Sequence, residues 1–151
     1  MARCPARGKE VHFLYMEESI FMKIIKREIP ADIVYEDDTT IAFLDINPIA
    51  PGHTLAVPKK QVRNIFDVDD ETLCTLMRTV RHIATPIREA LGADGMNISM
   101  NNEPSAGQIV FHMHVHLIPR YQNDKLVMWP PGKATSEELR TAAQKIRARF
   151  L

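Results

Sequence analysis

Three histidines alternate with apolar residues in the segment 108–120, which reads QIVFHMHVHLIPR. A β-strand sends successive side chains to opposite faces, so this spacing puts His112, His114 and His116 on one face and the apolar residues between them on the other. Helical geometry would scatter the three rings. Because imidazole can act as a nucleophile, a proton donor or a metal ligand near neutral pH, the segment predicts a chemical site on an extended strand.

Three interpretations of this face are possible. A polar face without chemistry is the least favoured, because three of only six histidines gather in one place. A metal site comes second, since imidazoles at i and i+2 can chelate zinc, but no Asp, Glu or Cys lies between Gln108 and Arg120 to complete it. Nucleophilic catalysis at phosphorus comes first: a neutral imidazole attacks while its neighbours stabilise the phosphoryl oxygens and supply a proton.

The composition narrows the class of partner. A chain of 151 residues predicts one domain, and equal numbers of basic and acidic residues, 19 each, give no reason to expect a nucleic acid or a membrane surface as partner. A small molecule fits this neutrality better. With only Cys4 and Cys74 present, and Cys74 in a helix expected to be buried, we predict no disulfide and a reducing, cytoplasmic location.

Residues 1–15 contain no apolar run of signal-peptide length and are predicted to be a disordered extension, with Met16 as the natural start and residues 16–151 as a single domain. Helices are predicted from Ser19 to before Pro30, from 69 to 91 with a kink or an early end at Pro86, and from a Thr135/Glu138 capping box to Phe150. Strands are predicted at 33–35, 40–44, 53–57, 96–100 and in the histidine segment.

These elements indicate an α+β fold: a five-stranded, mostly antiparallel sheet with one long helix and two terminal helices. The long helix presents an apolar stripe to the core, with His82 on its polar side. Three methionines are expected to fill the core: Met77, Met96 and Met100.

The histidine segment resembles the signature of the histidine triad (HIT) family, His-φ-His-φ-His-φ-φ with φ apolar, at every position from His112 to Ile118. The resemblance extends over residues 19–132 and includes FLDI at 43–46, PGH at 51–53 and AGQ at 106–108. It implies a homodimer in which two five-stranded sheets join into one of ten strands. It also implies hydrolysis or transfer of purine nucleotides at the α-phosphorus, without a cofactor.

By the same resemblance, His114 would be the nucleophile and would form a covalent nucleotidyl-histidine intermediate. His116 would bind phosphate oxygens, His112 and His53 would orient the nucleophile and relay protons, and Gln108 would donate to the phosphate or leaving group. Asp45 would accept hydrogen bonds from the ribose hydroxyls. The pocket would be completed by Asn101 and Gly107 beside the phosphate and by an apolar wall around the base: Phe21, Ile29, Phe43, Leu44 and Ile46.

Two positions depart from the family pattern. Many relatives have a Cys-x-x-Cys pair that forms a zinc site with two histidines, corresponding to His53 and His112, but this chain has Ser19 and Met22 instead. We therefore predict no metal. Many relatives also have Ser or Thr directly after the glutamine, where this chain has Ile109, which leaves the leaving group open.

The sequence thus predicts a nucleotide hydrolase or transferase that acts on AMP-containing substrates, either an adenosine phosphoramidate or a dinucleoside polyphosphate. Two alternatives stay open. One is a nucleotide-binding scaffold or regulatory protein with incidental hydrolysis. The other is a metal-dependent hydrolase that uses the three histidines as ligands.

Overall fold

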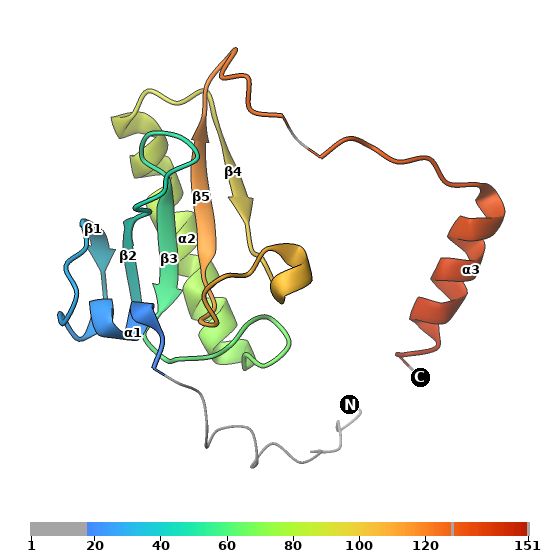
Figure 1. The fold of residues 1–151 in the computed structure, drawn as a ribbon, viewed down its shortest axis with the longest axis horizontal. Helices are drawn as coiled ribbons and strands as arrows, with labels where there is room; N and C mark the ends of the chain where they lie inside the picture. The colour runs from blue at the N-terminus through green and yellow to red at the C-terminus, as the bar shows by residue number, and fades with distance from the viewer. Residues whose placement is uncertain (1–17, 128, 151) are drawn as a thin grey trace.

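The computed structural model describes residues 18–127 and 129–150. The expectations for residues 1–15 lie outside this range. Along the chain the elements are α1 (Ile20–Ile25), β1 (Ile33–Glu36), β2 (Thr40–Leu44), β3 (Thr54–Pro58), α2 (Asp70–Ala90), β4 (Gly95–Ser99), a short 3-10 helix η1 (Pro104–Ala106), β5 (Val115–Arg120) and α3 (Ser136–Arg147). The predicted α+β class is confirmed, and Figure 1 shows the five strands as one sheet.

The sheet has the order β1-β2-β3-β5-β4, and every neighbouring pair is antiparallel. β5, the histidine strand, is therefore internal, between β3 and β4. Within it His116 lies opposite Leu55 of β3 and Ser99 of β4. An internal strand has ladder partners on both sides, so the position of His116 is fixed by the sheet itself.

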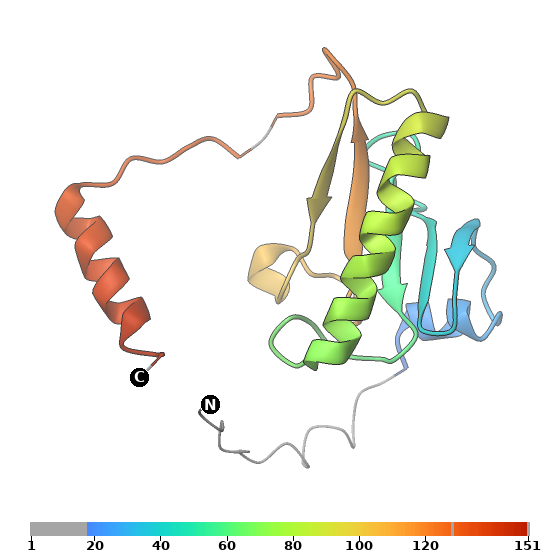
Figure 2. The same ribbon diagram turned by 180° about the vertical axis from the view of Figure 1, so that it is seen from behind.

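Helix α2 covers one face of the sheet (Figure 2). Asp69 caps its N-terminus by accepting from the backbone N–H of Thr72, as the acidic start predicted. The helix continues through Pro86 to Ala90, so the expected early end does not occur. The apolar stripe of α2 packs on inward-facing sheet residues in a cluster that includes Leu76, Val80, Ile83, Ala42, Ala56, Met113, Val115 and Leu117.

The opposite face of the sheet carries α1 and the imidazole of His116. Phe21 and Ile24 of α1 pack against alternate residues of β2 and β3 in a second cluster, which also contains Ile41, Phe43, Leu55 and Val57. Helix α1 ends at Ile25, not at Pro30, and Arg27 adopts a left-handed conformation (φ 65°) directly after it. α1 is thus a short helix of six residues that packs on the histidine side of the sheet.

Helix α3 stands clear of the sheet on the β4 side (Figure 1). Its predicted capping box is confirmed: Thr135 accepts from the backbone N–H of Glu138, and the Glu138 carboxylate accepts from that of Thr135. None of its residues is buried. No helix among the described residues is long and apolar enough to cross a bilayer.

Two expectations for α2 are wrong and one is confirmed. Cys74 is exposed, and Met77 is 40% exposed, because both project beside the buried stripe; they are not core residues. Met96 and Met100 do pack against the core. His82 is exposed, as predicted, and its ring contacts only Tyr35 among the described aromatic residues, with a centroid distance of 5.4 Å.

Candidate active site

Only one of the three alternating histidines lies in a strand. β5 begins at Val115, so His116 belongs to it, whereas His112 and His114 precede it in irregular backbone. The prediction of an extended strand through all three is therefore wrong. The rings nevertheless gather on the α1 side: the His114 and His116 ring centroids are 4.9 Å apart, and Phe21 lies 6.0 and 5.1 Å from the rings of His112 and His114.

His112 is held by both of its ring nitrogens. Nε2 is 2.8 Å from the carbonyl oxygen of Pro58, which can only accept, so Nε2 bears the proton. Nδ1 is then an acceptor and receives the hydroxyl proton of Ser19 at 2.7 Å. The ring is fully buried, with 0% exposure. A buried imidazole with both nitrogens satisfied is an anchor, and neither nitrogen is available to a metal or a phosphate without breaking a bond.

His114 is held by one ring nitrogen. Its Nδ1 lies 2.6 Å from the backbone carbonyl oxygen of His112, so Nδ1 bears the proton and Nε2 keeps its lone pair. Within the described part of the chain, Nε2 forms no hydrogen bond. This atom is also not fully buried. A neutral imidazole with an unengaged lone pair has the protonation state a nucleophile needs.

His116 presents the complementary group. The backbone N–H of Ile49 donates to His53 Nδ1 at 3.2 Å, which leaves the proton of His53 on Nε2. His53 Nε2 then donates to His116 Nδ1 at 2.9 Å, which leaves the proton of His116 on its own Nε2. That Nε2 is buried and has no partner among the described residues. A buried N–H without an acceptor fits an anionic oxygen placed next to His114.

Burial keeps the cluster neutral. It lowers the pKa of His112 to about 4, against the smaller effect of the Pro58 bond, and it lowers the pKa of His116 to about 4 with help from the neighbouring His114 and His53. The pKa values of His114 and His53 are also lowered, again mainly by burial, while Asp45 opposes the shift. All four imidazoles are therefore uncharged at neutral pH, as the hydrogen-bond assignment requires.

Asp45 lies beside this cluster. Its Oδ1 accepts from the backbone N–H of Asn47 at 2.8 Å, while Oδ2 is 3.6 Å from His53 Nδ1, too far for a hydrogen bond. Potential ligand atoms of Asp45, His53 and His116 lie within 4.8 Å of one another, the spacing of a metal site. A metal there would have to replace the hydrogen bond between His53 and His116. This group also differs from the three-histidine ligand set considered from the sequence, because His112 is not part of it.

The expected base wall is only partly assembled. Phe21 and Phe43 are buried and meet edge to face at 5.4 Å, and Ile29 packs against the same cluster. Leu44 is half-buried at the end of β2, and Ile46 is 86% exposed. Phe21 therefore contacts both the core and the histidines, Phe43 belongs to the core, and Leu44 and Ile46 are the more exposed members of the expected wall.

The loop before the histidines is held through Gln108, which is 3% exposed. Its side-chain nitrogen donates to the carbonyls of Arg63 at 2.7 Å and Val110 at 3.1 Å. Its oxygen accepts from the backbone of Glu103 at 2.8 Å and from Asn64 at 3.2 Å. Because both amide protons are used within the protein, this arrangement does not support the expected donation to a phosphate or leaving group; Gln108 is a scaffold for the loop.

Sequence reasoning missed the other half of this scaffold. Arg63 forms a bidentate pair with Glu103 at 2.8 and 2.7 Å, and the amide of Asn64 donates to the same carboxylate at 2.7 Å. The Arg63 guanidinium also lies 4.1 Å from the ring centroid of Phe111. These partners are about 40 residues apart along the chain, so no local pattern could have paired them.

Two predicted phosphate-loop residues lie together nearby. Gly107 ends η1 with φ 84°, a left-handed conformation that favours glycine, and its carbonyl accepts from the Asn101 side chain at 3.3 Å. Asn101 is half-buried and Gly107 is exposed. They thus shape the same loop, on its solvent side.

The positions of the family zinc site are occupied by a different network. The backbone N–H of Ser19 donates to Gln61 Oε1 at 3.3 Å, and its hydroxyl bonds His112. Ser19 thus links Gln61, through its backbone, to His112, through its hydroxyl. His53, which the family resemblance grouped with them, instead bonds His116.

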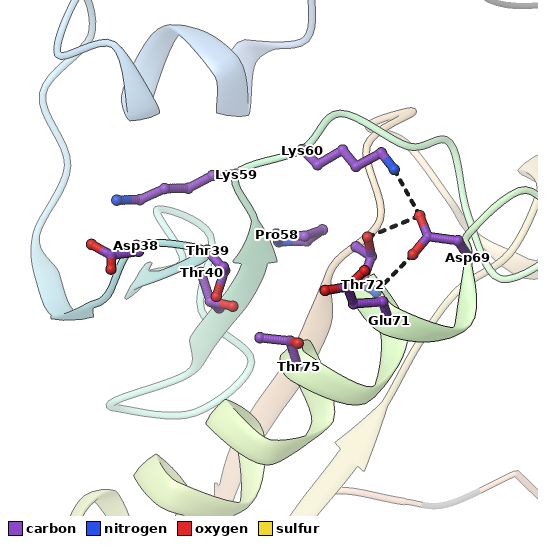
Figure 3. A pocket seen from close by; sticks show the side chains of 10 residues that line it. All are labelled: Asp38, Thr39, Thr40, Pro58, Lys59, Lys60, Asp69, Glu71, Thr72 and Thr75. Carbon is purple, nitrogen blue, oxygen red and sulfur yellow. Dashed lines mark hydrogen bonds and ion pairs between the residues drawn. The ribbon is translucent and has the colours of Figure 1, made fainter.

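A separate polar recess of about 320 Å³ lies at the N-terminal end of α2 (Figure 3). Lys60 pairs with Asp69 at its rim at 2.7 Å, and the buried hydroxyl of Thr40 has no partner among the described residues. Pro58, whose carbonyl anchors His112, also lines it. None of the catalytic or nucleotide-binding residues predicted from the sequence does.

Comparison with known proteins agrees with this geometry. A family model, the HIT domain, matches residues 26–123. An uncharacterized 13.1 kDa HIT-like protein of Mesomycoplasma hyorhinis is 50% identical over 106 residues, 70% of this chain and 96% of the relative. A HIT family structure from Bacillus subtilis superimposes with a TM-score of 0.80 at 38% identity, covering 88% of this chain and 97% of that chain. A histidine triad nucleotide-binding protein from Candida albicans gives a TM-score of 0.77 at 31% identity, with coverage of 88% and 97%.

Proposed function

Because the chain belongs to the HIT family, whose members are typically nucleotide hydrolases or transferases, we propose that it acts at the α-phosphorus of AMP-containing substrates. The substrate is an adenosine phosphoramidate or a dinucleoside polyphosphate. One observation carries the proposal: the rings of His114 and His116 have centroids 4.9 Å apart, and among the described residues neither the Nε2 lone pair of His114 nor the buried Nε2–H of His116 has a hydrogen-bond partner. A phosphorus atom bound between them would meet a nucleophile, and one of its oxygens would meet a hydrogen-bond donor.

The reaction proceeds in two displacements. His114 Nε2 attacks the α-phosphorus, a nitrogen–phosphorus bond forms, and the bond to the amine or polyphosphate leaving group breaks. Water then attacks the same phosphorus, the bond to His114 breaks, and AMP is released. The leaving amine takes up one proton in the first step and the attacking water loses one in the second, so the two steps balance. Because both rings are neutral in the free protein, the pair of His53 and His116, which lies beside Asp45, takes up one proton from solvent when the anionic substrate binds. The pair gives this proton to the leaving amine in the first step and regains one from the attacking water in the second.

The nucleoside part of the substrate would be held by a carboxylate and an apolar wall. Asp45 Oδ2 is the carboxylate oxygen without a hydrogen bond among the described residues, so it is the atom proposed to accept the ribose hydroxyls. Phe21 and Phe43 supply the buried part of the base wall, with Ile29 beside them. Leu44 and Ile46 close over the base from the rim.

A second candidate function is nucleotide binding with little turnover. It is favoured by Gln108, whose amide protons are both used by backbone carbonyls, and by Ile109, which has no hydroxyl to offer a leaving group. A site that binds AMP but protonates leaving groups poorly would act as a scaffold or regulator.

Turnover decides between these functions. The wild-type protein, His114→Ala and the matched control His82→Ala are each incubated with an adenosine phosphoramidate and with a diadenosine polyphosphate, and AMP release is measured. The proposed function predicts turnover by the wild type and by His82→Ala but not by His114→Ala. Turnover by His114→Ala at the wild-type rate excludes His114 as nucleophile. AMP binding without turnover by any protein favours the scaffold, and loss of activity with a chelator favours the metal-dependent hydrolase.

We also propose that the protein is a homodimer joined through β4. β4 is an edge strand with Ile98 47% exposed, and its pairing with β5 is regular. The other edge strand, β1, has a register shift between Ile33 and Tyr35, a feature that discourages edge pairing. Helix α3 lies on the β4 side of the sheet, where the second copy would be (Figure 1), and its apolar residues Leu139 and Ile146 are exposed. Light scattering of the full chain should give a dimer mass, and Ile98→Lys should lower it.

We also propose that the protein is located in the cytoplasm. Cys74 is an exposed free thiol, which suits a reducing compartment such as the cytoplasm.

A further inference from the structure

Ser19 makes two side-chain hydrogen bonds with different roles. As the N-cap of α1, its Oγ accepts from the backbone N–H of Met22 at 3.1 Å. The same Oγ lies 2.7 Å from His112 Nδ1, and Nδ1 is an acceptor because the proton of His112 is on Nε2, facing Pro58. The single hydroxyl proton of Ser19 therefore points at His112. A cap needs only the first of these bonds.

Two further contacts hold the start of α1 next to the histidines. The backbone N–H of Ser19 donates to Gln61 Oε1 at 3.3 Å. This bond fixes the position of the Ser19 backbone, from which the hydroxyl group projects. Two residues later, the ring of Phe21 lies against both His112 and His114. A displacement of Ser19 would therefore disturb contacts with the imidazoles of both His112 and His114.

The backbone of the segment needs such an anchor. His112 and Met113 lie outside any strand, and the ladder of β5 begins at Val115. Among the described residues, Met113 has one backbone bond to Val62, at 2.8 Å. The ring of His112, clamped between Ser19 and Pro58, fixes the residue whose carbonyl receives the Nδ1 proton of His114 at 2.6 Å. The tautomer and direction of His114 therefore depend on where His112 is held.

We propose that Ser19 is a positioning residue of the histidine site: its hydroxyl locks the ring of His112, and the His112 carbonyl in turn keeps His114 Nε2 unprotonated and aimed at substrate. This rests on the proposed function for the role of His114. It assigns α1 a part in the chemistry that capping alone would not give it.

Two substitutions separate positioning from capping. Ser19→Gly removes the hydroxyl, yet glycine is an acceptable N-cap residue and weakens the helix only slightly. Ser19→Thr keeps a hydroxyl that can donate to His112 and accept from Met22. Thr135→Ala is the matched control, because it removes an N-cap side chain from α3, which has no contact with the histidines.

The first measurement is ¹⁵N NMR of the histidine rings in the full-length, nucleotide-free protein, which reports tautomers independently of turnover. Wild type and Ser19→Thr should show His112 and His114 each as a single neutral tautomer, with protons on Nε2 and Nδ1 respectively. Ser19→Gly should show averaged or mixed signals for both rings. An unchanged ¹⁵N pattern in Ser19→Gly would overturn the proposal.

The second measurement is steady-state turnover. Ser19→Gly should lower kcat about ten- to hundredfold with little change in KM, since a misdirected nucleophile slows the chemical step more than binding. Ser19→Thr should restore most of kcat, and Thr135→Ala should leave it unchanged. Wild-type kcat in Ser19→Gly would reduce Ser19 to a cap. Failure of the proposed function itself is distinct, because it appears as wild-type turnover in His114→Ala.

Discussion

The two ends of the histidine segment differ in how their ring nitrogens are used. At His112 both nitrogens bond groups of the protein, Ser19 and Pro58, and the ring is completely buried. At His114 and His116 one nitrogen of each ring has no hydrogen bond among the described residues. Three identical side chains in one motif therefore differ in what they can offer according to their neighbours: one is an anchor, and the other two are the proposed nucleophile and the proposed donor.

Removing the donor should have the largest effect on rate. His116→Ala deletes the buried Nε2–H that is proposed to meet a phosphoryl oxygen, so kcat/KM should fall about a hundred- to thousandfold, the range seen when one oxyanion donor is lost. Its midpoint of urea unfolding should change far less than its rate, and His82→Ala should match the wild type in both. Near-normal turnover in His116→Ala would remove His116 from the chemistry.

Removing the anchor should act mainly on stability. His112→Ala leaves a cavity and strips partners from the Ser19 hydroxyl and the Pro58 carbonyl, both lying inside the protein. The free energy of unfolding should drop by about 3 to 5 kcal/mol, as for other large buried side chains. Urea denaturation measures it. Turnover should fall as well, because the His112 carbonyl positions His114. A free energy of unfolding equal to that of the wild type would contradict the role of His112 as the anchor.

The free energy of unfolding should depend on pH because His112, the anchor, is buried in its neutral form. The pKa of His112 is about 4 in the folded protein, below its ordinary value of 6.5, so the unfolded chain binds the proton more readily between these values. This contribution is complete above pH 6.5 and is lost as the pH falls toward 4, about 3 kcal/mol in all. Carboxyls with a lowered pKa, such as Asp37 at about 2, lose their contribution only at lower pH, below about 4. The free energy of unfolding in urea should therefore fall steadily from pH 7 to 4.5. His112→Gln should remove only part of this dependence, because the lowered pKa values of His116, His114 and His53 act in the same direction.

The loop scaffold should give the smallest effect. Arg63→Met breaks the partly exposed pair with Glu103, whose pKa is lowered to about 2 by Arg63 and Asn64. Because pairs exposed to solvent are screened, we expect only a small loss of stability, and a modest drop in kcat from a looser segment before His112. A double-mutant cycle with Glu103→Gln isolates the pair, and a coupling energy of zero would show that Gln108 alone holds the loop.

The sequence predicted the parts of the fold that local pattern encodes. β2 has the predicted bounds, the Thr135/Glu138 capping box is present, and α2 differs from its predicted range by one residue at each end. Alternation also correctly put the apolar partners of the histidines, such as Met113 and Val115, into the α2 core.

What the sequence could not provide depends on contacts between distant residues. His112 leaves the strand because Ser19 and Pro58, 93 and 54 residues away, hold its ring where no ladder exists. The engagement of Gln108 by Arg63, 45 residues away, could not be read from the motif. The tautomers of His114 and His116 likewise follow from a carbonyl and a neighbouring imidazole that only the folded chain supplies.

The central claim is that His114 Nε2 bonds to phosphorus, and trapping that bond tests it most directly. The full-length protein is mixed with substrate for less than one turnover, denatured in alkali to protect the acid-labile nitrogen–phosphorus bond, and analysed by intact mass and peptide mapping. The account predicts a mass gain of one adenylyl group on His114 in the wild type and none in His114→Ala. An adduct on another residue, or the same adduct in His114→Ala, would contradict it.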